Sequence, residues 1–293
     1  MNARIIFIGS GTSEGVPRVT CLAREGPACA ACLSAVQPGS KDRRRNTSLL
    51  IQRPHPDVAL SPAEPVGNVL LDAGKFFYQS AIDWFPKYQV RTLDAVVLTH
   101  THADAAGGLD DLRDWTNNNR QPSIPVYVRR DDMADLGRLF FYLVDRSKMT
   151  SGGSVAKLTF SEVGPEAFEV AGVRFTPLPV GHGRPWSAYG YRFGGVCYLP
   201  DVGEIPDETR PLIEGCDLLI LDALRPRRTH GSHLTLEQAV DEVRRLRPRR
   251  TLFTGMCHDI VHEPVNEELA RLKETEGLDI QLAYDGLSVD VEL

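Results

Sequence analysis

The sequence predicts an α+β fold in which two β-sheets pack on each other and helices lie on the outside. Short apolar runs rich in β-branched residues recur through all 293 residues, which is typical of buried strands. Amphipathic segments of helical length fall between several of these runs. Because a sheet or helix must bury its apolar face against another element, this mixture favours a layered sandwich. No linker-like composition divides the chain, so one domain over 1–293 is expected.

The predicted strands follow the apolar runs in chain order. They cover 4–8, 48–52, 68–73, 94–100, 124–128, 172–180, 187–193, 195–200, 217–223, 250–255 and 279–283. The proline-rich stretch 53–67 is interpreted as a hairpin excursion between two of them, not as a domain boundary.

The clearest predicted helix covers 236–246, where apolar residues recur on one face. Thr235 and Gln238 supply a capping-box pattern at its start, in which each side chain satisfies a backbone N–H of the first turn. Further helices are expected at about 109–119, 131–145 and 264–275.

Composition and charge exclude several classes of protein. The net charge of −6 does not favour a polyanionic partner, so nucleic acid is disfavoured and the basic clusters at 41–45, 225–228 and 244–250 are predicted to be solvated. No apolar stretch approaches the length of a membrane span, and the N-terminus lacks a signal-peptide pattern. Six cysteines in a chain of this size do not indicate a disulfide framework. A cytoplasmic location is expected; the oligomeric state is left open, a homodimer included.

The sharpest chemical signal lies at 96–115, where an apolar strand ends at Thr99. His100, His102 and Asp104 follow directly. Alternation of side chains along an extended segment aims both imidazoles at one point, with the carboxylate in reach. Imidazole and carboxylate ligands suit Zn²⁺, Mn²⁺ or Fe. The alternative, a pair of solvated loop histidines, is disfavoured by this tight spacing.

A second cluster contains Cys21, Cys29 and Cys32, while the other three cysteines are scattered. Three closely spaced cysteines in a cytosolic protein indicate zinc ligands, and a structural zinc site needs a fourth. Three buried thiols without a metal are the alternative.

The motif at 100–105 resembles the His-x-His-x-Asp-His signature of the metallo-β-lactamase superfamily. Segments 9–17, 43–51 and 70–74 resemble further blocks of that superfamily in the same order. The resemblance implies an αββα sandwich of two mixed sheets. It also implies that His182 is the third histidine of the first metal site and that Asp201 bridges the metals.

Within the superfamily, HADxxxGLDDLR and HxxHLTLEQA-like segments resemble the cyclic phosphodiesterases of phosphonate breakdown, which open 5-phosphoribosyl 1,2-cyclic phosphate. That resemblance implies a Cys-rich zinc-binding insertion at about 19–45, with His258 as the fourth ligand and His262 as the fallback. It implies His233 as proton donor, although His233 could instead simply begin a helix.

Two positions depart from the superfamily pattern. Ala105 stands where the signature has its last histidine, and Gly255 where a late histidine is expected. Both histidines normally serve a second metal, so that site is predicted to be weak or absent. Substrate-binding residues are not identified: nothing in the sequence separates four candidate arginines from surface charge, namely Arg184, Arg225, Arg227 and Arg228.

These observations predict a metal-dependent hydrolase, with Zn²⁺ or Mn²⁺ at the catalytic site, that acts on a small phosphodiester, cyclic esters included. Asp104 would orient or deprotonate the metal-activated water, and His233 would protonate the leaving oxygen. Two alternatives stay open: a tRNA 3′-processing endonuclease, since GTSxGVP and RNTS resemble that family too, and a degenerate, non-catalytic protein of the same fold.

Overall fold

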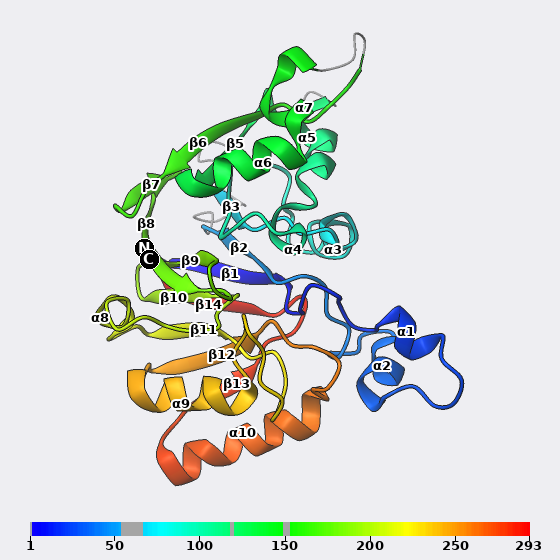
Figure 1. Ribbon diagram of the computed structural model, residues 1–293, viewed down its shortest axis with the longest axis vertical. Helices are drawn as coiled ribbons and strands as arrows, with labels where there is room; N and C mark the ends of the chain where they lie inside the picture. Colours follow the sequence, from blue (N-terminus) through cyan, green and yellow to red (C-terminus); the bar gives the residue numbers. More distant parts are fainter. Residues whose placement is uncertain (1, 54–66, 118–119, 149–152) are drawn as a thin grey trace, which may run out of the picture. The chain divides into compact units, whose positions relative to one another are not determined.

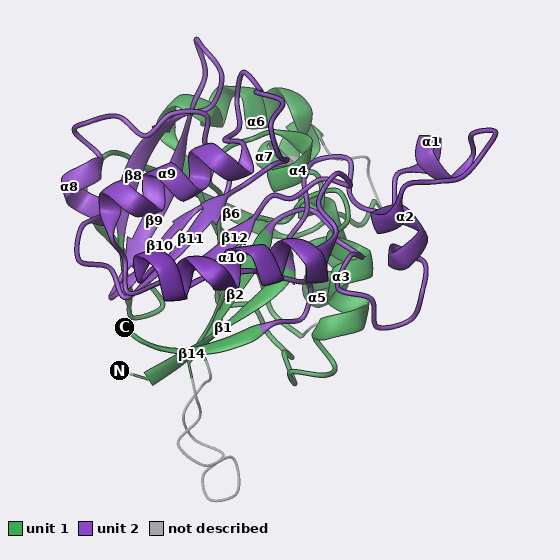
Figure 2. Ribbon diagram, turned by 90° about the horizontal axis from the view of Figure 1, so that it is seen from below, with its two compact units in different colours: residues 1–8, 48–175, 288–293 green, residues 9–47, 176–287 purple. Residues whose placement is uncertain are grey.

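The computed structural model describes residues 2–53, 67–117, 120–148 and 153–293. The described chain divides into two compact units that interleave along the sequence. Unit 1 contains residues 1–8, 48–175 and 288–293, and unit 2 contains residues 9–47 and 176–287 (Figure 2). The prediction of a single domain is not tested by this division and stays a prediction.

Unit 1 is built on a mixed seven-stranded sheet in the order β14-β1-β2-β3-β4-β5-β6 (Figure 1). Strands β3 to β6 run parallel to one another, whereas β1 pairs antiparallel with β14, and β2 pairs antiparallel with β3. Its strands are β1 (Asn2–Gly9), β2 (Ser48–Gln52), β3 (Asn68–Leu71), β4 (Ala95–Val97), β5 (Ile124–Arg129), β6 (Leu158–Val163) and β14 (Ser288–Glu292).

Helices of unit 1 pack on this sheet through one apolar core. Phe77 and Ala81 of α3, Leu136 of α6 and Leu143 of α7 lie in the same buried cluster as Leu50 of β2. The helical elements are α3 (Phe77–Trp84), α4 (Ala103–Ala106), the 3₁₀ turn Leu109–Leu112, α5 (Arg113–Asn117), the 3₁₀ turn Arg130–Asp132, α6 (Met133–Leu139), α7 (Phe141–Val144) and the 3₁₀ turn Arg146–Lys148.

Unit 2 contains most of a second seven-stranded mixed sheet, in the order β13-β12-β11-β10-β9-β8-β7. The boundary between the units falls inside β8, after Phe175. The strands are β7 (Phe168–Val170), β8 (Val173–Gly181), β9 (Ser187–Phe193), β10 (Val196–Leu199), β11 (Leu218–Asp222), β12 (Arg250–Thr254) and β13 (Ile280–Leu282). Strands β10 to β13 are parallel, which places their C-terminal ends, and the loops that follow them, along one edge.

Helices α9 (Leu236–Leu246) and α10 (His262–Glu276) cover one face of this sheet (Figure 1). Val240, Val243 and Leu269 lie in one buried cluster with the core side chains of β11 and β12. The predicted capping box is present: Thr235 Oγ1 accepts from Gln238 N at 3.2 Å, and Gln238 Oε1 accepts from Thr235 N at 2.9 Å. The short helices α1 (Val19–Leu22), α2 (Ala30–Ala35) and α8 (Arg210–Ile213) complete the unit.

The predicted α+β class with two mixed sheets is therefore confirmed. Three strands were not predicted, β6, β7 and β14. All three are edge strands, and in β6 and β14 exposed residues outnumber buried ones, so neither forms an apolar run. The helix predicted at 131–145 is interrupted at Phe140, and the expected hairpin at 53–67 lies almost wholly outside the described residues. Among those residues, no helix has both the length and the apolar character that crossing a membrane requires.

Candidate metal centre

The histidine motif of unit 1 lies at the C-terminal end of β4, one of the central parallel strands. His100 is buried, and its ring meets that of His102 edge to face with centroids 4.6 Å apart. His102 immediately precedes α4, whose first turn carries Asp104, and Oδ1 of Asp104 lies 3.9 Å from Nε2 of His100. The structure thus gathers the three residues predicted from spacing at one strand end.

A buried carboxylate stands behind His100. Asp72, with φ 63°, accepts hydrogen bonds from Thr99 N at 2.8 Å and from Thr99 Oγ1 at 2.9 Å. Oγ1 of Thr99 also lies 3.0 Å from Nδ1 of His100. With Asp72 ionised, the hydroxyl donates to it and accepts from Nδ1–H, so the lone pair of His100 is on Nε2. Burial raises the pKa of Asp72 to about 8, against the lowering effect of the Thr99 hydrogen bonds, so the ionised form that sets this tautomer is the one present above that pH.

The second group of candidate ligands belongs to unit 2 and lies on loops after β8 and β10. His182 follows β8, and its Nδ1 donates to the carbonyl oxygen of Ser232 at 3.0 Å, which leaves the lone pair on Nε2. Gly183, with φ 82°, allows this approach, since a Cβ there would lie 3.0 Å from Cβ of Ser232. Asp201 follows β10, and its Oδ1 lies 3.9 Å from Nδ1 of His233.

His233 is fixed by an acidic residue that the sequence analysis did not single out. Its Nδ1 donates to Oδ2 of Asp222 at 2.7 Å, and its ring stands edge-on to that of His182 at a centroid distance of 5.1 Å. Asp222 ends β11 and is completely buried. Burial raises the pKa of Asp222, while the charge of protonated His233 lowers it. In the sequence, Asp222 is one of several aspartates that follow apolar runs, and nothing there marks it as a partner of His233.

The backbone at Gly255 explains one departure from the superfamily pattern. Gly255 has φ 71°, and a Cβ at this position would lie 2.5 Å from Oδ1 of Asp222 and 3.3 Å from the carbonyl oxygen of Pro200. The buried Asp222 therefore occupies the space into which a side chain at 255 would project. Position 105, an alanine in α4, is likewise buried and offers no ligand atom.

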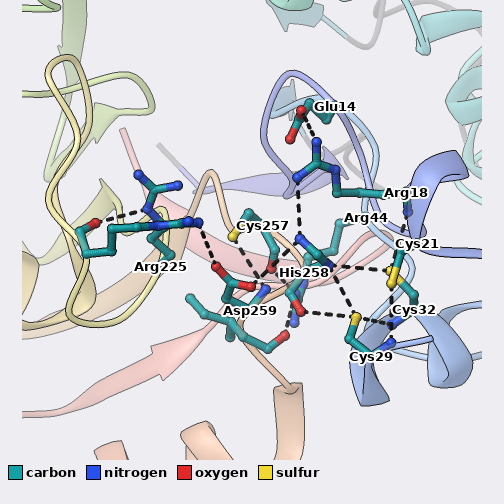
Figure 3. Close-up of polar contacts among 12 residues, drawn as sticks. Glu14, Arg18, Cys21, Cys29, Cys32, Arg44, Arg225, Cys257, His258 and Asp259 are labelled. Atoms are coloured by element: carbon teal, nitrogen blue, oxygen red, sulfur yellow. Dashed lines mark hydrogen bonds and ion pairs between the residues drawn. The ribbon is translucent and has the colours of Figure 1, made fainter. Parts of the chain in front are cut away.

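The cysteine cluster is assembled wholly within unit 2. Cys21 lies in α1, Cys29 caps α2 and Cys32 lies in its first turn. His258 comes from the loop between β12 and α10: its Nδ1 lies 3.2 Å from Sγ of Cys29 and 3.8 Å from Sγ of Cys32 (Figure 3). The four ligand atoms lie within 4.8 Å of one another. Backbone N–H groups also face the sulfurs, including Cys29 N to Cys21 Sγ at 3.2 Å.

Arg44 ties the cysteine-rich segment to the loop that carries His258. It is 1% exposed, and its Nη1 donates to the carbonyl oxygens of Cys257 at 3.1 Å and Ile260 at 2.9 Å. Nη2 of Arg44 pairs with Asp42 at 3.1 Å, and Asp42 in turn accepts from His262 N at 2.8 Å. The prediction that the basic cluster 41–45 is wholly solvated is wrong for Arg44, because loop carbonyls and a carboxylate replace its hydration.

Comparison with known proteins decides the family. Residues 67–256 match the family described as the beta-lactamase superfamily domain. The chain belongs to the metallo-β-lactamase superfamily. It is also 32% identical to a solved diphosphatase of the PhnP family, with a TM-score of 0.80, covering 100% of this chain and 98% of that one. This confirms the resemblance to the phosphodiesterase branch and makes the coarse class a metal-dependent hydrolase of the metallo-β-lactamase fold.

Two further proteins are similar to this chain. A protein of Porphyromonas gingivalis named octanoyltransferase is 32% identical over 292 residues, which are 99% of this chain and 52% of that protein. The chain thus spans about half the length of this curated relative. Zinc-bound PqqB from Methylobacterium extorquens is 19% identical, with a TM-score of 0.71, covering 98% of this chain and 100% of that one. At that identity the likeness shows the fold alone.

The residues of this superfamily member fit metal ions on chemical grounds. His182, Asp201 and His233 place three ligand atoms within 4.8 Å of one another, as do Cys21, Cys29, Cys32 and His258 in their own cluster. Thiolates with one imidazole are typical of closed structural zinc sites, whereas imidazoles with a carboxylate are typical of catalytic ones. The first set thus forms a candidate His/Asp metal site. His262, the predicted fallback, lies outside the cysteine cluster: it is 2% exposed and begins α10.

Proposed function

We propose that this protein is a metal-dependent phosphodiesterase that hydrolyses a small phosphodiester, cyclic esters included. The observation that carries the proposal is the arrangement at one edge of the second sheet, where His182, Asp201 and His233 lie on loops and Asp222 ends β11. The identity of 32% to a PhnP-family diphosphatase over nearly the whole of both chains supports a phosphoester substrate.

The superfamily pattern assigns His100, His102 and His182, with Asp201 as a further ligand, to the first metal, and the proposal keeps this assignment. The hydrogen bonds from Nδ1 of His100 and His182 leave Nε2 as the ligand atom of both rings. A divalent cation bound there supplies Lewis acidity and lowers the pKa of water from 15.7 to about 7. Asp104, beside His100, orients or deprotonates the attacking water.

His233 holds the proton that the leaving oxygen requires. Asp222 accepts the hydrogen bond from Nδ1, which fixes the ring and stabilises its protonated form, so Nε2 donates to the leaving group. General acid catalysis of this kind typically contributes about 10²–10⁴ in rate. One observation favours a second role for His233, that of a metal ligand oriented by Asp222. Its ligand atom lies within 4.8 Å of those of His182 and Asp201.

The second metal is proposed to be weak or absent. Position 255 cannot carry an imidazole in this backbone, and position 105 carries none. Asp104 and Asp201 are then the ligands that the superfamily pattern leaves for it, and hard carboxylate oxygens favour Mn²⁺ or Mg²⁺ over Zn²⁺.

Hydrolysis of bis-p-nitrophenyl phosphate tests the function. The purified protein is stripped with a chelator and reloaded separately with Zn²⁺ and Mn²⁺, and nitrophenol release is followed. We expect activity to return with metal, and Asp104→Asn to lose at least about 99% of it. Asp83→Asn, an exposed carboxylate in α3 of the same unit, is the matched control. Folded, metal-loaded protein without turnover would favour the non-catalytic alternative, and cleavage of a tRNA precursor in preference to small diesters would favour the nuclease.

A further inference from the structure

A pocket of about 290 Å³ lies within unit 2, next to His233. Three segments line it: the first loop, the loop after β11 and the loop between β12 and α10 (Figure 3). Basic side chains dominate the lining, namely Arg18, Arg225, Arg228, His230, His233 and His258. Arg184 and Arg227, which the sequence could not tell apart from Arg225 and Arg228, are not among the lining residues.

The positive charge of the pocket is only partly neutralised. Glu14 pairs with Arg18, and Asp259 pairs with Arg228 at 3.4 Å. Arg225 is held instead by neutral groups: its Nε donates to the carbonyl oxygen of Arg228 at 2.9 Å and its Nη2 to that of Thr229 at 3.2 Å. Three guanidinium groups thus face two carboxylates, and the balance favours an anion.

One wall of the pocket is made by the residue that completes the cysteine cluster. Nδ1 of His258 faces the cysteine sulfurs, while Nε2 lies 3.4 Å from Nη1 of Arg18 and 3.7 Å from Oδ1 of Asp259. Besides its side-chain contact with His258, Arg18 contacts the cluster through its backbone N–H, which donates to Sγ of Cys32 at 3.4 Å. The two sides of one imidazole therefore serve two different sites.

We propose that this pocket binds a phosphate or similar anionic group of the ligand, and that the cysteine cluster positions its wall through His258. When Nδ1 of His258 is held at the cluster, the proton of the neutral ring is on Nε2, so this nitrogen can donate towards Oδ1 of Asp259 and can no longer accept from Nη1 of Arg18. Asp259 in turn places Arg228, so occupancy of the cluster sets anion affinity. The inference rests on the proposed function only in taking a phosphoester as the source of the anion.

Titration calorimetry of the metal-loaded protein with inorganic phosphate tests the pocket without relying on turnover. Arg228→Gln should weaken binding about tenfold, the loss typical of one charge-assisted contact. Asp259→Asn should strengthen binding severalfold, because it removes a negative charge and the partner that competes for Arg228. Arg227→Gln is the matched control in the same loop, with no expected change. Equal affinities in all four proteins would overturn the anion pocket, even in a protein that hydrolyses phosphodiesters.

His258→Cys tests the role of the cluster. Four cysteines also bind zinc tetrahedrally, so this variant is expected to keep its zinc and its thermal stability while losing the imidazole that faces Asp259. We expect zinc content unchanged and phosphate affinity lowered at least about threefold. Unchanged affinity would show that the cluster is merely structural. If the variant does not bind zinc, wild-type protein with and without cluster zinc is compared, and equal phosphate affinities again overturn the coupling.

Discussion

Nδ1 of His233 lies 2.7 Å from Oδ2 of Asp222, a carboxylate that is completely buried at the end of β11. The same carboxylate also accepts from Val202 N at 3.2 Å, on the loop that carries Asp201. The carboxylate of Asp222, held at the end of a strand, therefore determines the direction of the imidazole.

Asp222→Asn should reduce kcat for a diester with a poor leaving group by at least about tenfold, since the amide no longer stabilises protonated His233. Metal content should stay unchanged, and the alkaline limb of the pH–rate profile should move to lower pH. Asp217→Asn, an exposed carboxylate just before β11, is the control for the charge change. An unmoved pH profile with reduced protein stability would assign Asp222 a structural role alone.

His233→Ala separates proton donation from metal binding. If His233 is the proton donor, this substitution should lower kcat at least about tenfold and leave the metal content unchanged. The loss should be smaller for good leaving groups such as p-nitrophenolate, which need no protonation. Kinetics over a series of phenyl esters, with elemental analysis of each preparation, measures both. Equal losses across the series contradict proton donation, and a loss of metal supports His233 as a ligand.

The cysteine cluster should contain one zinc ion that resists mild chelation. Cys29→Ser combined with Cys32→Ser should lower the zinc content by one ion per chain and lower Tm, since structural zinc contributes about 10–16 kcal/mol of apparent binding energy in small modules. Cys197→Ser, in a buried cysteine of β10, is the control. Zinc content unchanged in the double variant would exclude this cluster as a zinc site.

Metal at the second catalytic position should be partial and exchangeable. The geometry at Gly255 and the absence of a donor at Ala105 remove two imidazoles from that position, so full occupancy of the first site should coexist with weak occupancy of the second. Metal titration and anomalous scattering from crystals measure this. Two equally occupied ions about 3.5 Å apart, the spacing of two-metal sites, would contradict it.

His262 should make the fold sensitive to acid. Burial, reinforced by the charge of Arg44, lowers the pKa of His262 from 6.5 to about 4. The unfolded chain then binds a proton that the folded chain does not, so stability is lost as pH falls from 6.5 towards 4, by about 3 kcal/mol at 1.36 kcal/mol per unit. His262→Phe, which keeps the ring against Tyr284, should flatten this slope in denaturant titrations at several pH values. An unchanged slope would place the acid sensitivity elsewhere.

Residues that are close neighbours along the chain could be placed together before the fold was known. His100, His102 and Asp104 come together because five consecutive positions at a strand end cannot separate, and the helix 236–246 was predicted to the residue from its period and its capping box. The cysteines at 21, 29 and 32 share one short segment for the same reason. Family resemblance supplied the distant partners, His182, Asp201 and His258.

Contacts between residues that are far apart along the chain could be found only in the folded structure. Arg44 belongs to a run of charged residues that resembles a solvated surface, yet carbonyls more than 200 positions away replace its water. Asp222 is indistinguishable in sequence from any aspartate ending a strand until His233 is placed against it. Arg225 and Arg228 line the pocket whereas Arg184 and Arg227 do not, and only the course of the loops in the fold makes this difference. Such contacts could not be predicted because a buried polar group needs a partner that is near in space, not near along the chain. Pairs of this kind leave no periodic pattern in the sequence.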